Sequence, residues 1–271
     1  MGRAMRPRQL LFALCFALAA CGRSWGWQTR ATKATTAAAL VGAALCCHFP
    51  CVAAAVSGGN EYSQQVAASY DELDGGVAAD LLGLNSLRKE AAALLVKGGD
   101  VLEIAVGTGL QSPYYDTSAL ASFTGIDLSP SMLAEARVKW GGVRGHDGLH
   151  PKLLEMDASR LSFPDASFDS VIDTFSFCTF DEPAKALHEM TRVLRPGGRV
   201  VLLENSLSTN PLLAGLQDLT EPIITPLSKN CRWNVNIPKL AAAEPELQLV
   251  SAKDEQLGTI TLRSYVKRSL K

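Results

Sequence analysis

The stretch that decides the fold is "VLEIAVGTGL", residues 101–110, in which an aliphatic run precedes small residues at alternate positions. Glu103 lies inside the aliphatic run, and Ala105, Gly107 and Gly109 follow it. The aliphatic residues predict a short buried strand, and the glycines predict a tight turn directly after it. A strand that ends in bare backbone is typical of α/β sheets that bind nucleotides.

The residues around this stretch alternate between strand and helix patterns. Ser129 and Asp181 are the expected N-caps of two of the helices. Such alternation predicts a mostly parallel sheet that is covered on both faces and binds its ligand beyond the carboxyl ends of its strands. The expected helices span 78–99, 129–140 and 182–195, and the expected strands span 100–106, 122–127, 152–157, 168–175, 199–205, 247–253 and 259–266.

A pyrophosphate is a poor ligand for the turn at 101–110. A dinucleotide site requires G-x-G-x-x-G, and the register that starts at Gly107 has Ser112 in the third glycine position. S-adenosylmethionine fits better, because Glu103 suits its ammonium and sulfonium groups and would repel a pyrophosphate. Gly107 and Gly109 allow the backbone to approach such a ligand closely.

Two more acids end predicted strands. Asp127 stands 20 residues after Gly107 and can accept hydrogen bonds from both ribose hydroxyls. Asp157 can accept one from the adenine amino group, although it also fits an ordinary exit from a strand into a turn.

Four segments carry a family resemblance: "VLEIAVGTG", "FTGIDLSPSMLAEAR", "MDASRLSFPDASFDSVI" and "RVLRPGGRVVLLE". They resemble the successive motifs of class I S-adenosylmethionine-dependent methyltransferases, in particular the type 11 group with the ubiquinone and menaquinone enzymes. The resemblance implies a Rossmann-like, doubly wound, seven-stranded, mostly parallel sheet and S-adenosylmethionine as cofactor. It implies cofactor contacts at Glu103, Ala105, Gly107, Gly109, Asp127, Leu128, Asp157, Ala158 and Thr174.

Ala105 departs from the pattern, because most relatives have glycine there. If the φ angle at this position is negative, alanine costs nothing and stiffens the turn. We expect the cofactor turn to be intact.

The residues that would bind the methyl acceptor, here called the acceptor side, have weaker sequence signals than the cofactor residues. "YDELDGG", "TFSFCTF", "CRWNVNI" and "LGTI" are similar to an organellar, membrane-associated subgroup that implies a small apolar acceptor of the thiol, quinone or phenol type. The candidates on this side are Tyr70, Cys178 and Trp233. Tyr70 fits equally well as a packing residue, and Cys178 fits better as an inert core residue.

No catalytic base is assigned, since methyl transfer from a sulfonium is a direct displacement. An acceptor that needs a base would have Asp173 or Glu204 as the first candidates. The segment 206–237 is expected to cover the site with an apolar surface that includes Leu216 and Ile223. A helix packed on the sheet is an equally good interpretation.

Charge and cysteine content exclude several classes. The net charge of −1 conceals an acidic body, because six of the 26 basic residues but no acid precede Glu61. An acidic body argues against nucleic acid as a partner. Only Cys178 and Cys231 occur in the body, without zinc or disulfide spacing, so we expect no metal site.

The N-terminus has the pattern of a targeting leader. Residues 1–57 combine a basic start, a short apolar run, a threonine-rich basic stretch and a second apolar run. We expect a removable leader, with residues 60–271 forming the methyltransferase domain. A plastid destination is favoured, and a mitochondrion or an anchor in the endoplasmic reticulum membrane is the alternative. Association with a membrane surface is a further expectation.

Two other functions are compatible with the fold. A nicotinamide enzyme is disfavoured by the missing third glycine, and a non-catalytic binding or assembly protein is disfavoured by the intact cofactor motif.

Overall fold

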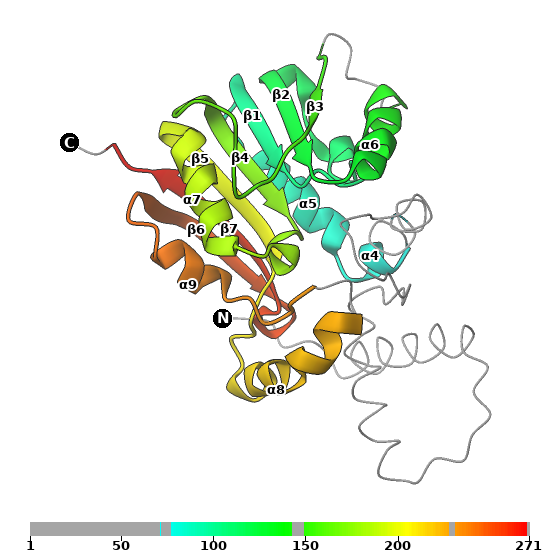
Figure 1. The fold of residues 1–271 in the computed structure, drawn as a ribbon, viewed down its shortest axis with the longest axis vertical. Coiled ribbons are helices and arrows are strands. Elements are labelled where there is room, and N and C mark those ends of the chain that lie inside the picture. Colours follow the sequence, from blue (N-terminus) through cyan, green and yellow to red (C-terminus); the bar gives the residue numbers. More distant parts are fainter. Residues whose placement is uncertain (1–70, 72–76, 143–148, 228–230, 270–271) are drawn as a thin grey trace. The chain divides into compact units, whose positions relative to one another are not determined.

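A computed structural model describes residues 71, 77–142, 149–227 and 231–269 of the chain (Figure 1). Its centre is a seven-stranded sheet with the order β3-β2-β1-β4-β5-β7-β6. β7 runs antiparallel to β5 and β6, and the other neighbouring strands are parallel. This confirms the expected doubly wound, mostly parallel sheet. The strands are β1 Gly99–Ile104, β2 Leu120–Asp127, β3 Lys152–Glu155, β4 Phe168–Thr174, β5 Leu194–Asn205, β6 Leu247–Glu255 and β7 Ile260–Lys267.

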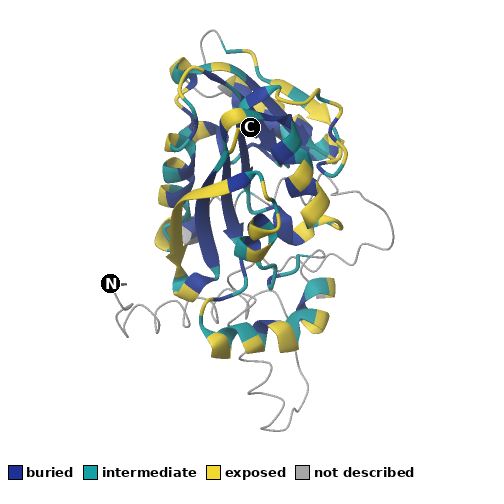
Figure 2. Cartoon of the chain, turned by 90° about the vertical axis from the view of Figure 1, so that its left-hand side faces the viewer, coloured by how far each residue is buried: buried dark blue, intermediate teal, exposed yellow. Residues whose placement is uncertain are grey.

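Helices cover both faces of the sheet, and a separate hydrophobic cluster lies under each layer (Figures 1 and 2). One cluster joins Leu187 and Met190 of α7 to Ile237 of α9, together with strand residues. The other joins Leu87 of α5 to Trp140 of α6. The helices are α4 Val77–Leu81, α5 Leu84–Ala93, α6 Pro130–Gly142, α7 Pro183–Val193, α8 Pro211–Leu227 and α9 Ile237–Ala242.

Three expected element boundaries were wrong. The helix expected over 78–99 is divided into α4 and α5 by Gly83, whose φ of 76° no helix interior tolerates. Glu182, not Asp181, is the N-cap residue of α7, and its side chain makes no capping hydrogen bond. The "RPGG" turn expected before the fifth strand lies within β5, whose pairing with β4 shifts register there.

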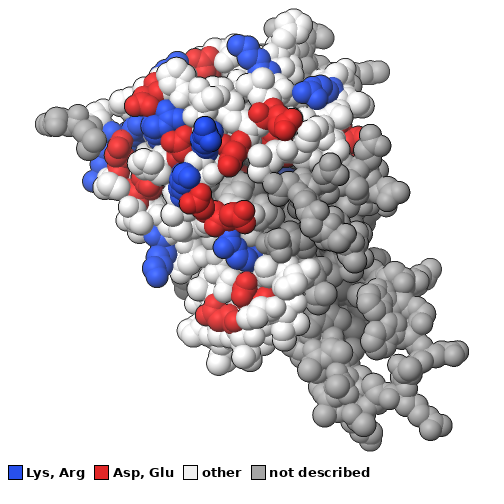
Figure 3. Space-filling model, viewed as in Figure 1, with Lys and Arg blue, Asp and Glu red and all other residues white. Residues whose placement is uncertain are grey.

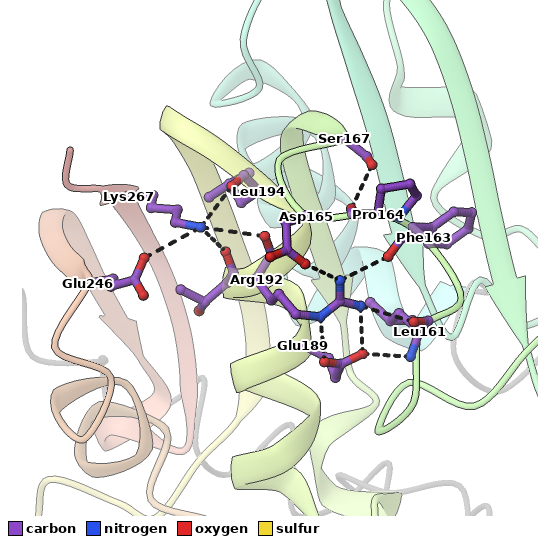
Figure 4. Close-up of polar contacts among 11 residues, drawn as sticks. Leu161, Phe163, Pro164, Asp165, Ser167, Glu189, Arg192, Leu194, Glu246 and Lys267 are labelled. Atoms are coloured by element: carbon purple, nitrogen blue, oxygen red, sulfur yellow. Dashed lines mark hydrogen bonds and ion pairs between the residues drawn. The ribbon is translucent and has the colours of Figure 1, made fainter. Parts of the chain in front are cut away.

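Arg192, in the "RVLRPGG" segment, fastens α7 to the loop before β4 (Figure 4). Its guanidinium donates to both carboxylate oxygens of Glu189, to Asp165 and to the carbonyl oxygens of Leu161 and Phe163, at 2.7–2.9 Å. This motif therefore holds the entry to β4, far along the strand from its carboxyl end.

α8 presents several large apolar side chains to the outside, next to the exposed Asp218. Gln217 and Ile224 are buried on its inner side, while Leu212, Leu219 and Ile223 are 87%, 75% and 66% exposed. Figure 2 shows the exposed outer side of this helix, and Figure 3 shows mostly uncharged surface there, interrupted by acidic side chains. Within the described part of the chain, no helix has the length and apolar content that a membrane crossing requires.

Candidate cofactor and acceptor site

The turn after β1 has three residues with left-handed backbone at alternate positions. The φ angles are 47° at Ala105, 56° at Gly107 and 82° at Gly109. Val106 closes the turn onto β2 by donating from its N–H to the Ile126 carbonyl oxygen at 2.8 Å. The condition under which alanine would cost nothing, a negative φ at Ala105, is therefore not met. Alanine there carries a strain of about 1–2 kcal/mol, which the glycine of most relatives avoids.

Glycine is needed at positions 107 and 109 for different structural reasons. A Cβ on Gly109 would lie 3.3 Å from Cα of Ala136, so this glycine lets α6 approach the turn. A Cβ on Gly107 would meet only the Ala105 carbonyl oxygen within 4 Å, at 3.9 Å. The space above Gly107 is therefore open to a ligand.

Asp127 joins the turn to the end of β2. Its Oδ2 accepts from the Gly107 N–H at 2.9 Å, and its Oδ1 accepts from the Ser129 N–H at 2.8 Å. Burial raises the pKa of Asp127, and the backbone N–H groups of Ser129, Gly107 and Leu128 oppose this shift. Ser129 caps α6 as expected, since its hydroxyl accepts from the Met132 N–H. A carboxylate is thus held in place at the carboxyl edge, beside the exposed Leu128.

Asp157 follows β3 at the same edge. The Met156 N–H donates to the Asp127 carbonyl oxygen, which places the two acids at neighbouring strand ends. Asp157 is exposed, and its Oδ1 accepts from the N–H and the hydroxyl of Ser159, as in an ordinary strand-to-turn exit. Ala158 is buried in the hydrophobic core.

Glu103 is buried under the turn. The Tyr115 hydroxyl donates to its Oε2 at 2.9 Å. Burial raises the pKa of Glu103 to about 8, against the opposing effects of this hydrogen bond and of the Arg88 charge. This pKa favours the protonated form of Glu103 at neutral pH.

The carboxyl end of β4 lies across β1 from Asp127. Thr174, the last residue of β4, accepts a long hydrogen bond from Nη1 of Arg88 at 3.4 Å. The next residue, Phe175, has a φ of 61°, which is strained for an aromatic residue and typical of functional sites. Its ring lies 5.1 Å from the Arg88 guanidinium.

Sequence reasoning missed Arg88, Tyr115 and a group that ties α6 to the turn. In this group Asp71 accepts from the Thr108 hydroxyl at 2.6 Å and pairs with Lys139 of α6. Lys139 also donates to Thr108 at 3.0 Å. Asp71 and Thr108 lie within quoted motifs, but nothing in the sequence indicates that they meet Lys139, and only the folded chain brings the three together.

The acceptor-side candidates have separate outcomes. Tyr70 lies outside the described residues. Cys178 and Trp233 are buried, and their segments pair where the Arg232 N–H donates to the Cys178 carbonyl oxygen at 2.8 Å. A hydrogen bond with Cys231, together with burial, raises the pKa of Cys178 well above its usual range. Neither side chain is presented to a ligand in this structure.

Asp173 and Glu204 are also fully buried at the ends of β4 and β5. Asp173 accepts from the Ser176 hydroxyl, and burial raises its pKa to about 7. Glu204 accepts from the backbone N–H groups of Ser176 and Phe177 at 3.3 Å. Burial and the Asp173 charge raise the pKa of Glu204 well above its usual range.

These residues fit S-adenosylmethionine. The open space above Gly107 and the fixed Asp127 carboxylate suit a ribose without a phosphate. Asp157 follows β3 on one side of the β2–β1 pair, and Thr174 ends β4 on the other side. The predicted contacts of Asp157 with adenine and of Thr174 with the amino-acid end are therefore compatible with the strand order.

Comparisons with known proteins agree with this geometry. Residues 102–202 match the family described as "Methyltransferase domain". The phosphatidylethanolamine N-methyltransferase of Cereibacter sphaeroides is 37% identical over 166 residues, which are 60% of this chain and 77% of the relative. The ubiquinone/menaquinone biosynthesis C-methyltransferase UbiE of Hahella chejuensis is 34% identical, with 74% of this chain and 82% of the relative covered.

A mitochondrial relative and a solved structure extend the comparison. The mitochondrial methyltransferase OMS1 of Saccharomyces cerevisiae is 28% identical over 59% of this chain, but only 36% of OMS1 is covered. The partner of the Haloferax volcanii Trm112 methyltransferase activator has the same fold, with a TM-score of 0.59 at 19% identity over 78% of this chain and all of that one. The chain belongs to the class I S-adenosylmethionine-dependent methyltransferases, and S-adenosylmethionine is its methyl donor.

Proposed function

We propose that the protein transfers the methyl group of S-adenosylmethionine to a small lipophilic acceptor of the thiol, quinone or phenol type. The observation that carries the proposal is the set of exposed aliphatic side chains on α8, the helix that follows the carboxyl end of β5 in the chain. Phe175 follows the last residue of β4, and the outward side of α8 displays aliphatic side chains. Relatives that act on quinone precursors and on phosphatidylethanolamine support an acceptor taken from a lipid environment.

The donor supplies an electrophilic methyl group on its sulfonium sulfur. The residues around it have two tasks: to hold the donor in a fixed direction and to keep the acceptor path apolar. Asp127 and Gly107 fix the donor from the β2 side. Alignment of donor and acceptor provides a large part of the rate acceleration in such a displacement.

An acceptor that ionises readily fits a site whose two buried acids, Asp173 and Glu204, have raised pKa values. Asp173 and Glu204 are the acids nearest in sequence to Thr174 and to the end of β5, and both are sealed in the core. Neither can take a proton from an acceptor without a rearrangement of the Ser176 loop, whose hydrogen bonds hold both of them. A thiol or phenol does not require such a base.

We further propose that the outward face of α8 contacts a membrane surface. The face lies opposite Gln217, whose side chain accepts from the Ser208 N–H and donates to the Ser206 and Trp233 carbonyl oxygens. These bonds fix the helix with Leu212, Leu219 and Ile223 outward. Apolar side chains on one side of a fixed helix can enter the boundary between lipid head groups and acyl chains.

The proposed location is an organelle. Residues 1–57, which lie outside the described residues, have the leader pattern, and the mitochondrial relative OMS1 supports an organellar setting. We propose a plastid as this organelle, because the leader contains two apolar runs. Mapping the N-terminus of the protein from its native source tests this proposal, and we expect it between Ala53 and Glu61.

An acceptor panel tests the proposed activity. The full chain, with isotope-labelled donor, is supplied with a lipophilic thiol, a demethylated quinone precursor, a phenol, phosphatidylethanolamine vesicles, transfer RNA and a protein mixture. We expect label in at least one of the first three acceptors and none in the RNA or protein. Efficient labelling of RNA or protein, with none in a small apolar molecule, would refute the proposed acceptor class. Labelling of phosphatidylethanolamine alone would replace the thiol, quinone or phenol by an amine head group.

A further inference from the structure

Arg88 carries a buried positive charge that forms no ion pair with any residue the structure describes. The residue lies on α5 and is 3% exposed. None of the ion pairs among the described residues includes it. Its Nε atom is buried and has no hydrogen-bond partner there.

The contacts that Arg88 does make place it at the cofactor site. Its Nη1 reaches Thr174 at the end of β4, at 3.4 Å, and its guanidinium lies over the Phe175 ring. Its carbonyl oxygen accepts from the Gln111 side chain at 2.8 Å. Gln111 belongs to the loop that follows Gly109, so this bond fastens α5 to the cofactor turn.

A buried cation without a counter-ion is destabilising, because its loss of hydration is not compensated. The ring of Phe175 and one long hydrogen bond recover only part of this cost. Apolar residues would pack at this position of α5 without the penalty. A ligand that brings an anion explains why the charge is present.

The strand order identifies the anion. Asp127 ends β2, on one side of β1, while Thr174 ends β4, on the other side. A donor whose ribose is held at Asp127 and whose adenine extends toward β3 has its amino-acid end directed toward β4. The α-carboxylate is the one anionic group of S-adenosylmethionine, and it belongs to that end. We propose that Arg88 binds the α-carboxylate of the methionine part of S-adenosylmethionine.

The unpartnered Nε and the long Nη1 contact suit this role. A guanidinium can bind a carboxylate through two parallel N–H groups, one of which is Nε–H. Lysine would supply the charge without this fork. Arg88 therefore contributes both affinity for the donor and the direction of its amino-acid end.

A ligand that differs by one group tests the assignment. Calorimetric titration compares S-adenosylmethionine with its decarboxylated form, for the full chain and for Arg88→Gln and Arg88→Lys. The wild-type protein should prefer the intact cofactor by about 10–100-fold, the range for a charged hydrogen-bonded pair. Arg88→Gln should lose this preference while its affinity for the decarboxylated form stays unchanged, and Arg88→Lys should retain part of the preference. Arg199→Gln, a half-buried arginine that donates to the Leu94 carbonyl oxygen, is the matched control and should behave as wild type.

Stability measurements separate binding from folding. Unliganded Arg88→Gln should unfold in urea at the same concentration as wild type or a higher one, since it removes an uncompensated charge. An equal loss of affinity for both ligands, or undiminished discrimination in Arg88→Gln, would overturn the proposal. If Arg88→Gln does not fold, Arg88→Lys with wild-type discrimination would also overturn it. A wild-type protein that binds neither ligand would refute the cofactor assignment itself.

Discussion

Ala105 takes a backbone conformation that is unfavourable for an L-amino acid, at the centre of the cofactor turn. Its φ is 47°, and the next residue, Val106, donates its N–H to the Ile126 carbonyl oxygen of β2. The motif made the turn predictable, but the sign of this angle was not predictable. Ala105 is the third residue counted from Glu103. Its presence does not reveal whether the backbone there has kept the left-handed conformation.

Replacing Ala105 by glycine should therefore stabilise the fold. Relief of left-handed strain exceeds the added freedom of the unfolded chain, so we expect a gain of up to about 1 kcal/mol in the free energy of unfolding. Ala166, exposed and with a φ of 53°, is the matched control away from the site. Urea unfolding should show a similar gain for both variants, with donor affinity unchanged. If the Ala105→Gly protein were less stable than wild type, the inferred backbone strain at Ala105 would be contradicted.

Glu103 should release a proton when the donor binds. Its pKa of about 8 keeps it protonated at neutral pH, and the ammonium and sulfonium groups of the donor favour its ionised form. Donor affinity should rise with pH up to about 8. Calorimetry at pH 7 in buffers of different ionisation enthalpy should detect the proton, and Glu103→Gln should release less. If both proteins released the same number of protons on donor binding, the proton would come from a group other than Glu103.

α8 shows how an element can be recognised in part from its sequence. The apolar residues of 206–237 were expected either to cover the site or to pack on the sheet as a helix. The structure has one helix here, and its Pro222 removes a hydrogen bond only from the exposed Asp218 side. Periodicity identified an apolar face of the helix. Which face is buried depends on Gln217, whose hydrogen-bond partners, Ser206, Ser208 and Trp233, lie outside the helix.

The outward side of α8 should govern binding to lipid. Leu219→Asp should weaken cosedimentation of the full chain with neutral phosphatidylcholine vesicles by roughly tenfold or more, the loss expected when one leucine no longer enters an apolar phase. Val138→Asp, at an equally exposed position of α6, is the matched control and should bind like wild type. Equal loss in both variants would show that α8 has no special role.

At the scale of the whole molecule, the sheet and its two hydrophobic layers followed from the sequence, and the interior polar groups did not. Strand and helix periods repeat locally, so they identify elements without knowledge of the fold. Arg88 meets Thr174, and Tyr115 meets Glu103, only because the fold brings α5 to the end of β4 and the loop after β1 back onto β1. Contacts of this kind between distant segments leave no pattern in one sequence.

The buried acids should make the protein less stable as pH rises. Glu103, Asp173 and Glu204 have raised pKa values, so between their ordinary and raised values they are protonated when folded and ionised when unfolded. The unfolded chain then binds fewer protons, and the free energy of unfolding falls with pH. For Glu103 the fall spans 4.5 to about 8. Urea unfolding at several pH values should show it, with a smaller slope in Glu204→Gln and the wild-type slope in the exposed control Glu155→Gln. A stability that rises over this range would contradict the buried, protonated acids.

Equilibrium binding of the donor tests the central claim most directly, namely that the turn at 105–109 and Asp127 form the cofactor site. In calorimetry with the full chain, S-adenosylmethionine and its demethylated product should bind, and NAD should not. Asp127→Asn should weaken donor binding by about 1–3 kcal/mol, because charged hydrogen bonds to the ribose are lost. The exposed Asp116→Asn variant should bind as wild type does. Undiminished affinity in Asp127→Asn, or binding of NAD as tight as that of the donor, would contradict the account.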